Sequence, residues 1–365
     1  MNSCKIGNRN FLYILFIYFV IAIWILISVP FTPQEADVLY NQHNFLATYL
    51  VKFISFFSKN FIILRTPFFI ISTFSLYLFN EILKKYFKDS QYRYLTLSIY
   101  ILIPGVFLSF VIVNYATITI FLTILFIYAY LKENKLIQTI ALVLLLFTNT
   151  AQFALYLALI IYSFRKKDWL LTSVSTTLFI LTSVIESYPI DGIPKGHLIS
   201  LFGIYGVTLS PLLFIITIYA LYKVALKGNQ ELIWHIAITV FIASVLLSIR
   251  QKIKVIDFTP YIVIAVPIVV EVFRNSISTR LKQFRLFYIK VCMLIFIVLL
   301  LETLFIIFNY PIYKYTGEQL YIIDRNIYEI DNNVEKMKQK GINCLKSIKK
   351  QDLNLYKYYD ITVCQ

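Results

Sequence analysis

The sequence predicts an all-α polytopic membrane protein, and its composition and apolar pattern carry that prediction. Hydrophobic residues make up 59% of the 365 residues and charged residues only 15%, well below the roughly 25% of ordinary soluble domains. Apolar runs recur along the chain, and a membrane span needs about 20 such residues. This pattern excludes intrinsic disorder, collagen, a disulfide scaffold and a soluble enzyme.

The formal net charge is +15, from 34 basic and 19 acidic residues. In a soluble protein this excess would suggest nucleic acid, but no basic stripe interleaved with aromatic residues lies outside the apolar runs. Most basic residues before residue 310 instead fall in short loops on one side, as the positive-inside rule expects. We therefore expect a membrane as the partner and no nucleic acid.

Eleven spans account for residues 1–308, which form the predicted transmembrane domain. Lys5 and Arg9 place the N-terminus in the cytoplasm, and residues 30–60 form a first outer loop along the interface. The expected spans are Phe11–Val29, Phe61–Leu83, two within Tyr94–Leu131 with a turn between Pro104 and Tyr115, two within Leu136–Phe164, Trp169–Ser187, Gly203–Ala225, Glu231–Ile249, Pro260–Phe273 and Leu286–Phe308.

The segment Leu136–Phe164 lies between two basic loops and is too short for two full spans. A single span would invert every later segment. A pair of short helices broken at Thr148–Gln152 and covered by neighbouring protein keeps both basic loops inside. We expect the pair, with Asn149 and Gln152 capping the freed backbone.

Residues 309–365 form a small polar segment on the outer side. A helical stretch near Asp331–Lys340 and a short strand-like end are expected in it. Cys344 and Cys364 would then face an oxidising compartment, where a disulfide between them is one arrangement, although the pairing is not set by the sequence.

Two acids follow the first span closely. Glu35 and Asp37 lie near the membrane surface, where partial desolvation raises a carboxyl pKa and suits a general base. The alternative is that both are solvated loop acids.

A basic cluster formed by Arg250, Lys252 and Lys254 ends the ninth span on the outer side, against the charge rule. It is either an anion clamp for a lipid phosphate, which Arg grips bidentately, or a nonspecific contact with anionic headgroups.

The sequence contains no Walker loop, GxGxxG fingerprint, HExxH motif or Ser/His/Asp constellation. No cofactor and no metal are expected.

The order of several blocks resembles the integral-membrane GT-C glycosyltransferases, in the branch of the protein O-mannosyltransferases and the lipid A aminoarabinose transferase. The resemblance covers roughly residues 10–275. TPQEADVLY is similar to an acidic D-E-A-x-Y loop, and Arg65 and Pro67 match an R-L-P-S segment. The other matching blocks are IPGVFLSFVIVNYATITIFL, LLLFTNTAQFALYLALIIYSF, PKGHLISLFGIYGVTLSPLLFIITIYALYKV with His197 in register, and SIRQKIKVIDFTPYIVIAVPIVV.

The resemblance implies transfer of a sugar from a polyprenyl-phosphate donor to a lipid, glycan or protein acceptor at the outer face of the plasma membrane. It assigns the general base to Glu35, or to Asp37, and donor-phosphate binding to the basic cluster, with help from Arg65. Asn114 and Tyr115 stand where many members carry a second acid, and Asn149 replaces a lysine. A non-catalytic transporter or a protein that handles lipid-linked glycans is the alternative. Neither inverted repeats nor paired midplane charges are evident, which favours the enzyme.

Overall fold

In the computed structural model, residues 2–40, 45–185, 196–318, 327–341, 344–345, 349 and 352–363 are described. Helices account for most of them, with one pair of two-residue strands. The elements are α1 Asn2–Ser28, α2 Pro33–Tyr40, α3 Phe45–Phe57, α4 Phe61–Tyr86, α5 Ser90–Leu102, α6 Pro104–Val111, α7 Tyr115–Leu131, α8 Lys135–Leu145, α9 Gln152–Lys166, α10 Trp169–Ile185, α11 Leu198–Leu209, α12 Pro211–Lys227, α13 Leu232–Arg250, α14 Val255–Val263, α15 Val266–Thr279, α16 Lys282–Ile307, α17 Asn309–Thr316, α18 Ile327–Gln339, β1 Cys344–Leu345, α19 Leu353–Tyr358 and β2 Thr362–Val363.

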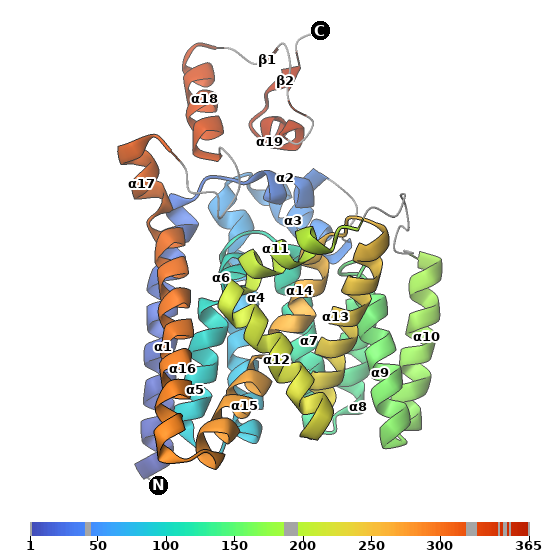
Figure 1. Ribbon diagram of the computed structural model, residues 1–365. Coiled ribbons are helices and arrows are strands. Elements are labelled where there is room, and N and C mark those ends of the chain that lie inside the picture. Colours follow the sequence, from blue (N-terminus) through green and yellow to red (C-terminus); the bar gives the residue numbers. More distant parts are fainter. Residues whose placement is uncertain are drawn as a thin grey trace.

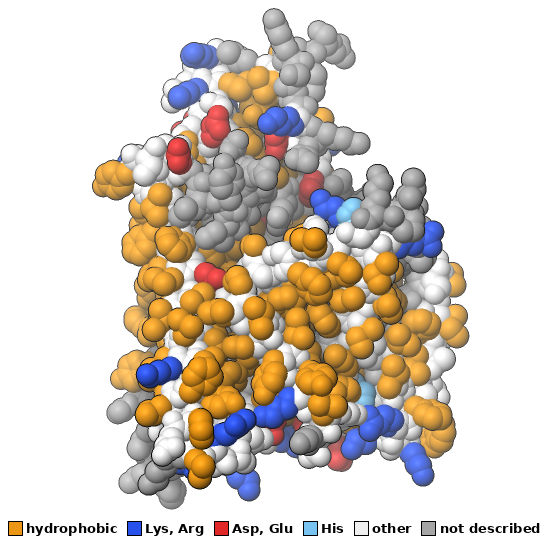
Figure 2. Space-filling view, in the orientation of Figure 1, with side chains coloured by type: hydrophobic (Ala, Val, Ile, Leu, Met, Phe, Trp, Pro, Cys, Tyr) orange, Lys and Arg blue, Asp and Glu red, His pale blue; other side chains and the backbone are white. Residues whose placement is uncertain are grey.

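The helices form a bundle whose two chain termini lie at opposite ends (Figure 1). The helices α2, α3 and α17–α19 lie at one end of the bundle, which we call the tail end. The N-terminus lies at the opposite end, which we call the N-terminal end. Large apolar side chains cover much of the outer surface of the bundle (Figure 2). An apolar surface of this extent suits lipid rather than water.

The predicted all-α class is confirmed, and the helices are compatible with a polytopic membrane protein. Four described helices are long and apolar enough to cross a membrane, and the number is seven if each of three bent helix pairs is one span. The other apolar helices are shorter, at 10–17 residues. The finer expectation of eleven spans stays a prediction.

Proline explains where two of the bent pairs divide. Pro104 and Pro211 begin α6 and α12, because proline fits the first turn of a helix but not its interior. The bends are 69° between α5 and α6 and 106° between α11 and α12. Pro104 therefore bends the chain without reversing it, and the reversal expected near it comes later, at residues 112–114.

The expected break in the segment 136–164 is present. The short helices α8 and α9 flank it, and Thr148, Asn149 and Gln152 are buried there. The Asn149 side chain accepts the amide of Ala151 at 3.2 Å, and Gln152 Nε2 donates to the carbonyl of Leu146 at 3.2 Å. Both amides thus satisfy backbone groups that the break releases, as buried polar groups require.

The tail forms a small polar unit over the bundle. The expected helix near residue 331 is α18, and the expected strand-like end is β2, which pairs in parallel with β1. Cys344 is disulfide-bonded; its expected partner Cys364 lies outside the described residues. The helix α19 packs against α2, so that the tail is anchored on the first loop.

Asn149→Leu tests the importance of the buried amide at the break. We expect a loss of about 2–4 kcal/mol in the free energy of unfolding, because the partners of the amide would be left unpaired in an apolar site. Thermal unfolding in detergent micelles measures this loss. Asn134→Ala is the control: Asn134 also caps a helix, but at an exposed site, and should cost about 1 kcal/mol. Equal small losses would show that the break does not depend on Asn149.

Candidate functional site

The start of α2 fixes the direction of Glu35 by a reciprocal pair of hydrogen bonds. The Thr32 hydroxyl accepts the amide of Glu35 at 3.2 Å, and the Glu35 carboxylate accepts the amide of Thr32 at 2.8 Å. This is a capping box, which the spacing T-x-x-E favours, and Pro33 occupies the first helical position. The sequence analysis predicts Glu35 as a general base or a solvated loop acid, and the T-x-x-E spacing is the signal that indicates its capping role instead.

The Glu35 carboxylate is fully buried against Arg65. Arg65 Nε donates to Oε1 at 2.7 Å and Nη2 donates to Oε2 at 2.6 Å, with both side chains 0% exposed. The amide of Val113 also donates to Oε1, at 2.9 Å. With the Thr32 amide, four donors occupy the carboxylate, about as many as a carboxylate can accept.

Arg65 uses its remaining donors on the end of α1. Nη1 donates to the carbonyls of Leu26 and Val29, and Nη2 donates to that of Pro30, over 2.7–3.1 Å. A guanidinium has five N–H donors, and all five of these bonds are made within the protein. Arg65 can bind a donor phosphate, and Glu35 can take a proton, only if this buried pair opens.

Asp37 lies on the exposed side of the same short helix. Its Oδ1 accepts a hydrogen bond of 2.7 Å from the side chain of Asn354 in α19. Asp37 therefore stands at the contact between the first loop and the tail, and of the two predicted acids it is the one that reaches the surface.

The turn before α7 joins the first loop to α14. Asn114 caps α7 through a bond from the amide of Ala116 at 3.0 Å. The Tyr115 hydroxyl donates to the buried carboxylate of Asp257, which also accepts from Thr150 Oγ1 at 2.8 Å. Asp257 in α14 therefore links α7 and the break after α8 to α14.

Asn149 extends this buried network. Its Nδ2 donates to the carbonyl of Asp257 at 3.1 Å, and its Oδ1 accepts from the hydroxyl of Tyr261 at 3.3 Å. The sequence does contain these polar residues inside apolar runs, a signal that often marks functional or structural polar clusters in membrane proteins.

The predicted basic cluster lies on the turn between α13 and α14. Arg250, Lys252 and Lys254 are all exposed there, and Lys254 stands at the N-cap position of α14 without a side-chain capping bond. The amide of His197 donates to the carbonyl of Ser248 at 3.0 Å. The start of α11 is thereby held beside the end of α13, so His197 and the basic cluster belong to one region of the tail end.

A cavity of about 180 Å³ opens among the elements that carry the predicted residues. Gln34, Asn114 and Thr208 contribute polar groups to it from α2, the start of α7 and α11. The other lining residues are Gly105, Val106, Leu108, Ser109, Ala116, Ile120, Ile256, Thr259, Pro260 and Val263. None of these described lining residues is ionisable at neutral pH.

Gly105 closes one wall of this cavity. A Cβ placed on it would lie 2.8 Å from the carbonyl oxygen of Thr208. That is too close for any larger residue without a shift of α6 or α11, so the approach of these two helices depends on a glycine.

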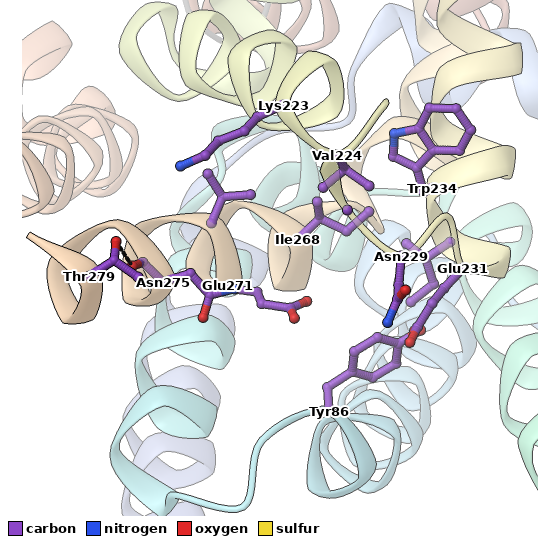
Figure 3. Close-up of a pocket in the computed structure, with 13 residues that line it drawn as sticks. Tyr86, Lys223, Val224, Asn229, Glu231, Trp234, Ile268, Glu271, Asn275 and Thr279 are labelled. Carbon is purple, nitrogen blue, oxygen red and sulfur yellow. Dashed lines mark hydrogen bonds between the residues drawn. The ribbon is translucent and has the colours of Figure 1, made fainter. Parts of the chain in front are cut away.

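A second cavity lies at the N-terminal end and contains none of the predicted site residues. It measures about 430 Å³ and is lined by the end of α4, the turn between α12 and α13, and α15. Figure 3 shows Glu271 and Glu231 extending into the same space, with Tyr86 beside Glu231. Both acids are exposed, as expected for solvated groups at a membrane boundary.

Among the described residues, no group of three or more His, Cys, Asp or Glu side chains could hold a metal ion. Comparisons with protein-family models, with curated proteins and with solved structures give no match. The site must therefore be interpreted from its own geometry.

The buried pair makes a clear stability prediction. Glu35→Gln keeps the shape of the side chain but leaves Arg65 as a buried charge without its counter-charge, which should cost about 3–5 kcal/mol. Thermal or denaturant unfolding in micelles measures the loss. Asp89→Asn, which breaks an exposed pair with Arg274, is the control and should cost under about 1 kcal/mol. A Glu35→Gln protein as stable as the control would show that the pair does not hold the tail end together.

Proposed function

We propose that the chain is a membrane glycosyltransferase of the GT-C type, which transfers a sugar from a polyprenyl-phosphate donor to an acceptor at the tail end. The observation that supports it best is that three segments far apart in the sequence meet in space. The three segments that the resemblance assigns to the active site meet through Glu35 and Val113 and through Tyr115 and Asp257. A cavity with neutral polar groups lies among these segments and can accept an uncharged sugar ring.

The expected topology fits this function. Eleven membrane segments, with α8 and α9 as a pair of short ones, would place the termini on opposite faces, as they are in Figure 1. The positive-inside rule then assigns the N-terminal end to the cytoplasm and the tail end to the outer face of the plasma membrane. A lipid-linked donor in the outer leaflet of the cell envelope would reach the tail end.

Each predicted residue takes a role that its surroundings allow. In the D-E-A pattern of the resemblance, Gln34 stands at the first acidic position and Glu35 at the second. Gln34 lines the cavity, whereas Glu35 is committed to Arg65. We therefore assign Glu35 and Arg65 to positioning α2, and the general base to Asp37, one helical turn beyond Gln34.

The exposed basic cluster supplies the donor site. Arg250, Lys252 and Lys254 lie on the turn that leads into α14, whose Ile256 lines the cavity. A phosphate held there would place the anomeric carbon toward the cavity, and the cations would stabilise the charge that develops on the leaving lipid phosphate.

A second function is favoured by one observation. Because the described part of the cavity lining contains no ionisable group, the same site could bind a lipid-linked glycan without reacting with it. The chain would then be a non-catalytic handling protein, and donor binding without transfer would identify it.

Asp37→Asn separates these functions. In membranes supplied with a radiolabelled polyprenyl-phosphate sugar pool, we expect the wild type to move label to an acceptor and Asp37→Asn to lose about 10²–10⁴-fold of that rate. The thermal unfolding midpoint should be nearly unchanged, because Asp37 is exposed and the amide oxygen of an asparagine can still accept the bond from Asn354. Glu318→Gln, which alters an exposed acid beyond α17, is the control. Full transfer by Asp37→Asn would overturn its assignment, and binding without transfer by the wild type would favour the handling protein.

The triple change of Arg250, Lys252 and Lys254 to Ala tests the donor site. We expect an increase of about tenfold or more in the KM for the donor, since charge-assisted bonds to phosphate would be lost. The matched control is Lys166→Ala with Lys167→Ala at the N-terminal end of the bundle. An unchanged KM in the triple variant would contradict the assignment.

A further inference from the structure

A large groove lies between the tail and the edge of the bundle, away from the cavity described above. It measures about 900 Å³. The end of α1, the junction of α3 and α4, α17, α18 and α19 all contribute to it.

One wall of the groove is apolar and continuous with the outer surface of the bundle. Trp24 and Ile27 on α1 are 49% and 61% exposed. The indole N–H of Trp24 donates to the carbonyl of Ile307 at the end of α16, at 3.3 Å. A tryptophan with an apolar ring outward and a bonded N–H is typical of the membrane boundary. This wall therefore suits a hydrocarbon chain.

The opposite wall is polar and belongs to the tail. Asp331, Glu335 and Lys338 come from α18, and Tyr358 and Tyr359 follow from α19. The Tyr359 hydroxyl donates to Asp331 at 3.0 Å. Acidic side chains are visible on the tail above the apolar surface (Figure 2). Carboxylates accept hydrogen bonds from hydroxyl groups, and tyrosine rings pack on the faces of sugar rings. This wall therefore suits a hydroxylated ligand.

The charges of the groove disfavour an anionic ligand. The described lining contains two lysines, Lys59 and Lys338, and Lys59 pairs with a third lining carboxylate, Asp360, at 3.3 Å. Asp331 and Glu335 add negative charge beside them. A phosphate headgroup would meet these carboxylates, whereas an uncharged saccharide could donate to them.

We propose that this groove binds a membrane-anchored glycolipid, with the saccharide against α18 and α19 and a hydrocarbon chain along α1. The glycolipid would be the acceptor of the proposed transfer, and this part rests on the proposed function. Binding itself needs neither a donor nor transfer.

The experiment uses photo-crosslinking of the full chain in nanodiscs of phosphatidylethanolamine and phosphatidylglycerol. The probe is a glucosyl diacylglycerol that carries a diazirine in one acyl chain, and phosphatidylethanolamine and phosphatidylglycerol with the same diazirine are the comparators. We expect the glycolipid to label peptides that contain Trp24 and Ile27 several-fold more than either comparator does. Equal labelling by all three probes would overturn the proposal, and so would stronger labelling by phosphatidylethanolamine.

A pair of matched variants tests the polar wall. Glu335→Gln with Lys338→Gln changes two residues of α18 that line the groove; Glu329→Gln with Lys336→Gln changes two of the same helix that do not. We expect glycolipid labelling to fall about fivefold to tenfold in the first pair, since bonds to the headgroup are lost, and to stay unchanged in the second. Unfolding midpoints of both double variants check that each one folds. Equal effects would overturn the proposal.

The outcome is separable from that of the proposed function. Specific labelling in a chain that transfers no sugar would support glycolipid binding in the groove and contradict the proposed glycosyl transfer. Transfer to a glycolipid without labelling at α1 would keep the enzyme and reject the groove.

Discussion

The buried ion pair between Glu35 and Arg65 is the interaction on which the tail end depends. Removing two charges from water is costly, and the cost is offset only where geometry is good and every donor and acceptor is satisfied. Here nine hydrogen-bonding positions, four on the carboxylate and five on the guanidinium, are met by the pair itself and by backbone groups. The pair therefore joins the end of α1, the start of α2, the first turns of α4 and the turn after α6.

That arrangement carries the rest of the region. The tail packs on α2 and on the segment before it: α19 contacts α2, and Tyr358 stacks on Phe31 with ring centres 4.0 Å apart. Tyr358 lies near the Glu35 charge, and burial with that charge raises the pKa of its hydroxyl to about 12. The turn after α6 belongs to this cluster through Val113 and to the Asp257 network through Tyr115. The buried acids Glu35 and Asp257 thus hold the helices in place. The charged groups that a ligand can reach are exposed ones, Asp37 and the basic cluster.

The sequence predicted much of this fold because apolar length and polar interruption are local signals. The break between α8 and α9 followed from the length of one segment between two basic loops, and the helix α18 followed from its polar pattern. The number of spans was less secure, because short and bent helices are buried by neighbours that a local pattern does not reveal.

The site was harder to predict for a related reason. The position of Glu35 and Asp37 shortly after the first span predicted that both acids lie near the membrane surface. It did not predict which of the two is buried. The burial of Glu35 depends on Arg65, thirty residues away, and on the capping box with Thr32. The T-x-x-E spacing indicates that box, but the same glutamate also fits a general base. The contacts of Asp257 were not predictable either, because the distant residues Tyr115 and Thr150 cannot be placed beside it from sequence.

The most direct test is a structure of the chain with a polyprenyl-phosphate sugar bound. We expect the phosphate to lie beside Arg250, Lys252 and Lys254 and the sugar to lie in the cavity lined by Gln34 and Asn114. The Glu35–Arg65 ion pair should remain closed. A phosphate bound by Arg65 after the pair has opened, or a donor bound away from these residues, would contradict these expectations.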